Sequence, residues 1–172
     1  EAKLSSGQAL VITEQELLPN KVASPPDELP DWSIQATLVG LVLAGLFFIS
    51  SKKETFFNAL CVIFWFVSGL IGTALFAIWI ATEHYFVHGN ENILLFSPFA
   101  WIAILLFFTR HKSSAWFSAF TYSVKLLAAL AALAVLIKLF PFGNQNNGHW
   151  LLMVLPVQWV IVRTINKKSF KK

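Results

Sequence analysis

The stretch F-F-N-A-L-C-V-I-F-W-F-V-S-G-L-I-G-T-A-L-F-A-I-W-I-A, residues 56–81, decides the fold class of this chain. It carries no charged side chain and exceeds the about 20 apolar residues that a helix needs to cross a bilayer. Similar apolar stretches recur at 33–49, 93–108, 116–140 and 150–165. The sequence therefore predicts an all-α polytopic membrane protein, a helical bundle of about five transmembrane helices.

The composition of the chain supports this class. Hydrophobic residues make up 56% and charged residues 13% of the 172 positions, whereas about a quarter of the residues in a soluble domain are charged. Seventeen Phe and seven Trp suit lipid-facing and interfacial positions. The net charge of +4 does not indicate nucleic-acid binding, because the basic residues fall in loops and a tail whose positions the membrane topology explains.

Charged residues alternate between the two sides of the five apolar stretches. Eight of the nine acids fall on one side, and Glu54 is the exception. Nine of the thirteen basic residues fall on the other side, namely Lys52, Lys53, Arg110, Lys112, Arg163, Lys167, Lys168, Lys171 and Lys172. Because Lys and Arg are enriched in cytoplasmic loops, we predict that this basic side is cytoplasmic, with the N-terminus outside and the C-terminus inside.

Three parts of the chain follow from this topology. Residues 1–31 hold four of the seven prolines and are expected to form a periplasmic linker. Residues 32–166 form the five-helix transmembrane domain, and residues 167–172 form a basic cytoplasmic tail. Since the chain begins with Glu1 rather than Met and its lead-in is acidic and proline-rich, we expect a piece of a longer protein with a further domain on the outer face.

Polar residues gather in the two predicted outer loops, A-T-E-H-Y-F-V-H-G-N-E-N at 81–92 and P-F-G-N-Q-N-N-G-H-W at 141–150. Because both loops are short, their side chains are expected at the height of the outer lipid headgroups. We call the following nine residues the polar rim and predict that they contact lipid or a partner domain: Glu83, His84, His88, Asn90, Asn92, Gln145, Asn146, Asn147 and His149.

Three other interpretations of the polar rim stay open. Outer loops are polar simply because they are wet, and Asn and Gly end helices and form turns. His84 and His88 have the i, i+4 spacing of metal ligands, but no H-E-x-x-H pattern is present. Acid–base catalysis by His84 with Glu83 or Glu91 would require a nucleophile that the chain does not evidently supply. We expect neither a metal nor a cofactor.

Small residues within the apolar stretches indicate close helix packing. The run S-G-L-I-G-T at 68–73 places Ser, Gly, Gly and Thr on nearby turns of one helix, which allows two helix backbones to approach. Pro98 and Pro156 each interrupt a helix near one end, where neighbouring groups must satisfy the freed carbonyl. Cys61 lies inside an apolar stretch and is expected to be a small buried hydrophobic residue.

Single residues near the membrane boundaries also have expected roles. Asp31 is expected to cap the first helix, and Trp32 to anchor it at the outer interface. Lys125 is the intramembrane charge, for which either a functional role or snorkelling to the inner interface is expected. Lys138 lies near the outer end of the fourth helix, within reach of lipid phosphate or of an acid of the outer loops.

Two short motifs resemble a known family. The run T-E-H at 82–84, followed by N-E-N-I-L-L-F-S-P at 90–98, is similar to a pattern in the membrane-embedded C-terminal part of the Lnb-like bacterial lipoprotein N-acyltransferases. A later Gln/Asn segment of that family resembles residues 145–147, and the likeness in layout spans about residues 27–165. Glu83 stands where the family pattern has aspartate, and Phe96 where it has tryptophan.

The resemblance implies an envelope enzyme of Gram-negative bacteria that transfers an acyl chain from a phospholipid to the amino group of a lipoprotein's N-terminal cysteine. In that family the catalytic Cys and His belong to a periplasmic domain that precedes the helices, so no catalytic residue is assigned within this chain. We accordingly expect an inner-membrane, multi-pass domain that anchors and positions a periplasmic catalytic domain, supplied in cis or in trans.

The expected partners are membrane lipid, that catalytic domain and a lipoprotein substrate, but no nucleic acid. A non-enzymatic integral membrane subunit that binds another membrane protein is the alternative. A transporter or channel is disfavoured, because Lys125 is the one intramembrane charge and no internal repeat is visible.

Overall fold

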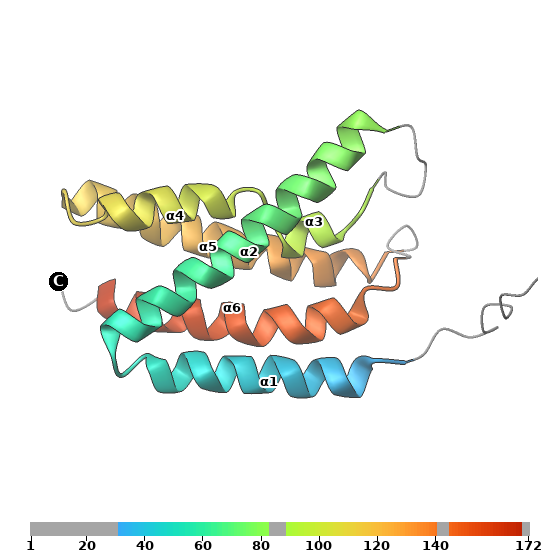
Figure 1. Ribbon diagram of the computed structural model, residues 1–172, viewed down its shortest axis with the longest axis horizontal. Helices are drawn as coiled ribbons and strands as arrows, with labels where there is room; N and C mark the ends of the chain where they lie inside the picture. The colour runs from blue at the N-terminus through green and yellow to red at the C-terminus, as the bar shows by residue number, and fades with distance from the viewer. Residues whose placement is uncertain (1–30, 83–88, 141–144, 170–172) are drawn as a thin grey trace, which may run out of the picture. The chain divides into compact units, whose positions relative to one another are not determined.

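The computed structural model describes residues 31–82, 89–140 and 145–169, and the regular secondary structure in this part of the chain is all α-helical (Figure 1). The helices are α1 (Ser33–Ser50), α2 (Glu54–Ala81), α3 (Asn92–Leu95), α4 (Ala100–Thr109), α5 (Ser114–Ile137) and α6 (Gly148–Ser169). Five segments are long and apolar enough to cross a membrane, with α3 and α4 together forming the third. The predicted all-α class and the five spans are confirmed.

The five spans run up and down, so that their ends gather in two groups. In Figure 1, α1 and α6 begin at the end of the bundle where α2 and α5 finish. We call this the rim end, and we call the opposite end, which carries Lys52, Lys53, Arg110, Lys112, Arg163 and Lys167, the basic end. The alternation of charge along the sequence therefore corresponds to a separation of charge between the two ends of the bundle.

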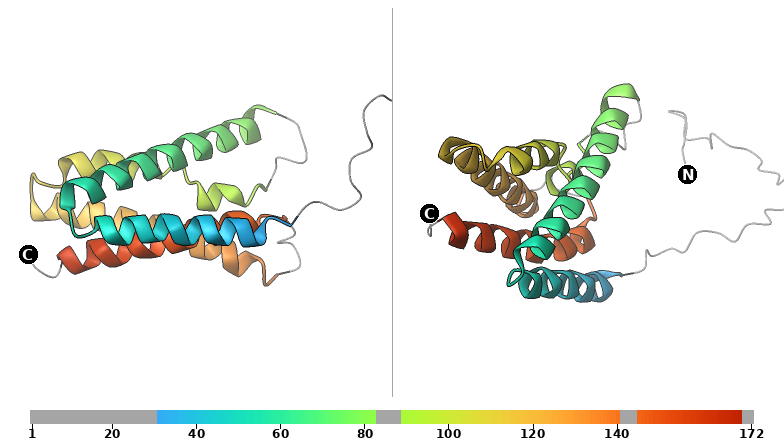
Figure 2. Two further views of the ribbon diagram at one scale, coloured as in Figure 1. Left: turned by 60° about the horizontal axis from the view of Figure 1, so that its bottom comes forward. Right: turned by 60° about the vertical axis from the view of Figure 1, so that its left-hand side comes forward.

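Helix α6 packs between two other long helices, α1 and α5. It lies beside α1 along most of their length and also packs against α5, which in turn packs against α4. Helix α2 crosses the bundle obliquely, touching α1 near the basic end and α3 and α4 further on, so that it rises away from α1 towards Ala81 (Figures 1 and 2). Between 28% and 33% of the residues in each span are buried inside the protein, and the others are partly or largely exposed.

The core forms where α2, α4, α5 and α6 meet, around Trp65. This side chain is fully buried, and its ring makes edge-on contacts with Phe107 at 6.2 Å and Phe120 at 5.7 Å between centroids. Val157 and Ile161 of α6 belong to the same buried cluster. Aromatic pairs in this edge-to-face arrangement contribute beyond the area they bury, which helps to fix four helices that lipid alone would not drive together.

Two glycines in the predicted small-residue face of α2 allow close contacts with the third span. A Cβ added at Gly72 would lie 2.0 Å from the carbonyl oxygen of Phe96, and one at Gly69 would lie 2.9 Å from the indole of Trp101. The Trp101 indole also donates a hydrogen bond to the Thr73 hydroxyl oxygen at 2.9 Å. The prediction of close packing at 68–73 is confirmed, with the α3–α4 segment as the partner.

The third span is broken rather than continuous. We predicted one helix over 93–108 with an interruption at Pro98, and the structure instead has α3 and α4 joined by a bend at Phe96–Phe99. Pro98 has no amide hydrogen to donate, and the Ser97 hydroxyl accepts from the Phe99 amide at 3.3 Å, which starts the second helix. The bend brings the Phe96 carbonyl against Gly72, so the interruption is also a packing contact.

The predicted cap at the start of α1 is observed. The carboxylate of Asp31 accepts a hydrogen bond from the Ser33 amide at 2.9 Å. Trp32 is 56% exposed, and its role as an anchor at the outer interface stays a prediction. Hydrogen bonds from the side chain and backbone of Ser33 hold the pKa of Asp31 below its ordinary value. Asp31 therefore satisfies one of the free amides at the beginning of the first span.

Candidate functional site

Six polar residues from three separate segments meet at the rim end. Their side chains or backbones are joined by hydrogen bonds and one ion pair, although residues 90–92 lie more than forty positions before the other two segments in the sequence. We call this set the Glu91 cluster, and its members are Asn90, Glu91, Asn92, Lys138, Gln145 and Asn147. It ties the beginning of the third span to the end of α5 and the beginning of α6.

An ion pair between Glu91 and Lys138 lies at the centre of this cluster. The Glu91 side chain is 9% exposed and that of Lys138 is 23% exposed, so the pair is largely withdrawn from solvent. Lys138 is the C-cap of α5, where a cation is favoured by the helix dipole, and its ammonium also donates to the Gln145 backbone carbonyl. Of the two partners predicted for Lys138, lipid phosphate or an outer-loop acid, the structure has the acid.

Gln145 joins the loop before α6 to the segment before α3. Its amide oxygen accepts from the Glu91 backbone amide at 2.7 Å, and its amide nitrogen donates to the Asn90 side-chain oxygen at 3.1 Å. The oxygen and the nitrogen of the Gln145 side chain are thus both bonded to residues 90–91. This arrangement fixes the position of Glu91 through its backbone while Lys138 fixes its carboxylate.

Asn147 is the most buried member of the Glu91 cluster, at 1% exposure. Its side-chain nitrogen donates to the Asn92 oxygen at 3.1 Å, and its backbone carbonyl accepts from the Trp150 and Leu151 amides at the start of α6. Within the described residues its side-chain oxygen has no hydrogen-bond partner. A buried amide in this position holds two helix beginnings together.

The structure thus unites four of the nine polar rim residues, Asn90, Asn92, Gln145 and Asn147. Asn146 is exposed beside them, and the His149 ring lies 5.3 Å from its neighbour Trp150 rather than in the cluster. The remaining three, Glu83, His84 and His88, lie outside the described residues, and so do the metal and acid–base interpretations that depend on them.

Glu91 and Lys138 were not included in the predicted polar rim, although their ion pair lies among four of its residues. The sequence did contain a usable signal, since Glu91 stands between two asparagines in the first loop and Lys138 lies just before the second loop. Pairing them required knowing that the end of α5 and the beginning of the third span come together, since the two residues are separated by the whole of α4 and α5.

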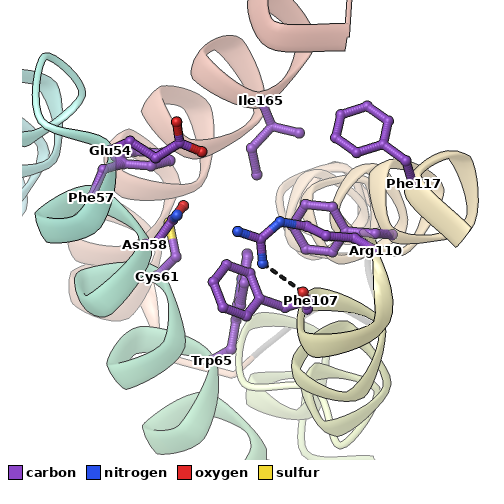
Figure 3. Close-up of a pocket in the computed structure, with 10 residues that line it drawn as sticks. Glu54, Phe57, Asn58, Cys61, Trp65, Phe107, Arg110, Phe117 and Ile165 are labelled. Atoms are coloured by element: carbon purple, nitrogen blue, oxygen red, sulfur yellow. Dashed lines mark hydrogen bonds between the residues drawn. The ribbon is translucent and has the colours of Figure 1, made fainter. Parts of the chain in front are cut away.

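A second polar group lies at the basic end, in a small cavity between α2 and α4 (Figure 3). Arg110 is only 9% exposed, its guanidinium donates to the Phe107 carbonyl at 2.5 Å, and it lies 3.5 Å from the centroid of the Phe107 ring. Burial lowers the pKa of Arg110, and the charge of Glu54 acts in the opposite direction. Glu54 and Cys61 also line this cavity.

This cavity is too small for a substrate. Its volume of about 40 Å³ is near that of one or two water molecules. Cys61 is 1% exposed, which confirms the prediction of a small buried residue. The Arg110 guanidinium also lies 5.7 Å from the centroid of the Phe120 ring, so its contacts join the end of α4 to α5.

Lys125 does not face the interior of the bundle. Its side chain is exposed on α5, and its ammonium lies 5.6 Å from the centroid of the Tyr122 ring, one turn nearer the basic end. This is the direction that snorkelling to the inner interface requires. A role for Lys125 in a proton or ion path inside the bundle has no support from this geometry.

The comparisons with known proteins agree with the helical architecture. The chain matches the family model described as the Lnb transmembrane domain over residues 32–170, which is most of its length. The comparison with curated proteins finds no match, and neither does the comparison with solved structures. The matched region contains all five spans and the whole Glu91 cluster. This multi-pass membrane chain belongs to the Lnb transmembrane domain family.

Proposed function

We propose that this domain anchors a periplasmic acyltransferase domain in the inner membrane of a bacterium and positions it over lipoproteins. The acyl group would pass from a phospholipid to the amine of the lipoprotein's N-terminal cysteine. The observation that carries the proposal is the match to the Lnb transmembrane domain over residues 32–170. The membrane domain itself supplies no catalytic residue in this proposal.

The position of the Glu91 cluster supports the positioning role. It lies at the rim end, the end of the bundle where α1 and α6 begin. A partner domain resting there would meet the exposed carboxamide of Asn146, which both donates and accepts hydrogen bonds, beside a charge pair that is already neutralised. Such a surface suits contact with a protein or a headgroup at a fixed height.

Positioning provides a physical advantage for a reaction between two membrane-anchored substrates. Each substrate carries its reactive group close to the headgroup layer, so an active site held at that height encounters both by diffusion in two dimensions. Holding reactants in the correct geometry turns a two-body search into a confined one. A rigid base contributes only if its rim does not shift, and the ties between α3, α5 and α6 serve that purpose.

The test uses the protein as its cell makes it, including any sequence encoded before Glu1. It is expressed in bacteria depleted of their own lipoprotein N-acyltransferase, and the N-terminal peptide of a reporter lipoprotein is weighed by mass spectrometry. The proposal expects an acylated amine. A free amine in cells that contain the folded, membrane-inserted protein would contradict acyl transfer and favour the alternative, a subunit that binds another membrane protein.

A second comparison tests the positioning role separately. The double variant Glu91→Gln with Lys138→Met removes the charge pair, and Leu139→Ala serves as the matched control because Leu139 is adjacent but 78% exposed. Acylation per folded molecule should fall about tenfold in the double variant, equivalent to about 1.4 kcal/mol of lost positioning. Equal activity in both variants would show that the Glu91 cluster has no part in the reaction.

A further inference from the structure

Three residues of α6 form one ridge at the basic end. Trp159, Arg163 and Lys167 follow each other at intervals of four, which places them on one face of the helix. All three side chains are exposed, and Trp159 is 68% exposed. The ridge therefore presents an aromatic ring towards the middle of the membrane and two cations towards its surface.

A hollow lies on each side of this ridge. One, of about 190 Å³, is closed by Phe48 and Ser51 from the end of α1. The other, of about 370 Å³, is bordered by Val162 and Asn166 of α6 itself. Both are several times larger than the space that one ordered water needs. The ridge residues line both hollows, so a molecule in either one would touch Arg163 and Lys167.

The two cations of the ridge have no partner among the residues that the structure describes. Neither the Arg163 guanidinium nor the Lys167 ammonium makes a hydrogen bond or an ion pair there. Two other basic residues near helix ends behave differently, since Arg110 is buried against Phe107 and Lys138 is paired with Glu91. The ridge thus holds two positive charges four residues apart whose counterion must come from elsewhere.

We propose that this ridge binds one acidic phospholipid, with its phosphodiester between Arg163 and Lys167 and an acyl chain along Trp159. The guanidinium fork matches two phosphate oxygens, and the ammonium adds a second point charge. Exposed Phe48 and half-buried Val160 provide an apolar floor for the chain below the headgroup. The Ser51 hydroxyl already donates its hydrogen bond to the Phe48 carbonyl oxygen. The two cations would therefore bind the phosphate without it.

A general excess of positive charge on one side of a membrane protein is the simpler account of these residues. Lys112 allows the two accounts to be separated. It carries the same charge at the same end, but it is exposed on the turn before α5 and lines neither hollow. A general charge effect would treat Lys112 and the ridge cations alike, whereas a built site depends on the ridge alone.

The experiment is native mass spectrometry of the purified chain in a neutral detergent, titrated with phosphatidylglycerol or with phosphatidylcholine. Wild-type protein should retain the acidic lipid preferentially. The double variant Arg163→Gln with Lys167→Gln should bind phosphatidylglycerol about 30-fold more weakly, because each cation near a lipid surface contributes about 1 kcal/mol and 1.4 kcal/mol is tenfold. Lys112→Gln should bind as wild type does.

Two results would overturn the proposal. One is equal binding of phosphatidylglycerol by the wild type and the double variant when thermal unfolding shows both to be folded. The other is full displacement of the lipid by inorganic phosphate at the same concentration, which would make the site a receptor for the free ion. Because this site is at the opposite end from the Glu91 cluster and the readout is binding, its failure leaves the proposed acyl-transfer function untouched.

Discussion

Gly40 of α1 lies directly against the backbone carbonyl of Leu152 in α6. A Cβ at position 40 would be 2.4 Å from that oxygen and 2.9 Å from the Met153 Cα. Leu152 is the residue four positions before Pro156, which has no amide hydrogen, so its carbonyl is the one that the proline leaves without a helical partner. The closest approach of α1 to α6 therefore occurs where the backbone of α6 is interrupted.

Replacing Gly40 by Ala should destabilise the domain, because the new methyl group meets backbone atoms that cannot rotate away. We expect a loss of about 1 to 3 kcal/mol, the usual cost of overpacking. Gly45 is the matched control, since it lies in the same helix and a Cβ there would meet nothing within 4 Å. Thermal unfolding in detergent measures both, and equal stability of the two variants would show that the contact is loose.

The two glycines in α2 should respond unequally to the same change. At Gly72 the obstacle is the Phe96 carbonyl, which is backbone, whereas at Gly69 it is the Trp101 side chain. Gly72→Ala should therefore be clearly more destabilising than Gly69→Ala, where the indole has room to shift at the expense of its bond to Thr73. Reversal of this order in the same unfolding assay would mean that the bend at 96–99 adapts more readily than the tryptophan.

Breaking the ion pair from one side should cost more than removing it altogether. Glu91→Gln or Lys138→Met leaves the partner charge poorly solvated, and we expect about 2 kcal/mol, between the values for exposed and buried pairs. The double variant should recover part of this loss. A double-mutant cycle by denaturant unfolding measures the coupling, and strictly additive effects would show that the two residues do not interact.

The orientation of the domain in the membrane can be tested by cysteine labelling. In a Cys61→Ala background, Asn146→Cys at the rim end should react with an impermeant reagent added outside the cell, and Ser114→Cys at the basic end should react only after the membrane is opened. Both engineered positions are exposed. The opposite labelling pattern would place the Glu91 cluster in the cytoplasm and contradict the periplasmic proposal.

The number and the class of the spans could be predicted from the sequence, because each segment in a lipid bilayer must satisfy its own backbone hydrogen bonds. A chain of about 20 apolar residues must form a helix in a bilayer, whatever surrounds it. The ends of α1 and α2 accordingly fall within two residues of the predicted limits. The close packing at 68–73 was also predictable, since small residues in a transmembrane helix have few other uses.

The bend within the third span was harder to predict than its existence. Pro98 indicated an interruption, but whether a helix kinks or breaks depends on what receives the freed backbone groups. Here the Phe96 carbonyl packs against Gly72 of α2, which has no side chain to block it. This contact depends on the oblique crossing of α2. The break that Pro98 indicates thus depends on Gly72, a residue more than twenty positions earlier in the chain.

The sequence by itself determined which residues are polar and at which end of the bundle they fall, because alternation of spans follows from length and charge alone. Only the tertiary structure decided that Glu91 pairs with Lys138, that Gln145 and Asn147 join the same network, and that Asn146 and His149 do not. The physical reason is that hydrogen bonds act over about 3 Å with strict direction, and the packing of α3, α5 and α6 sets which loop residues come that close.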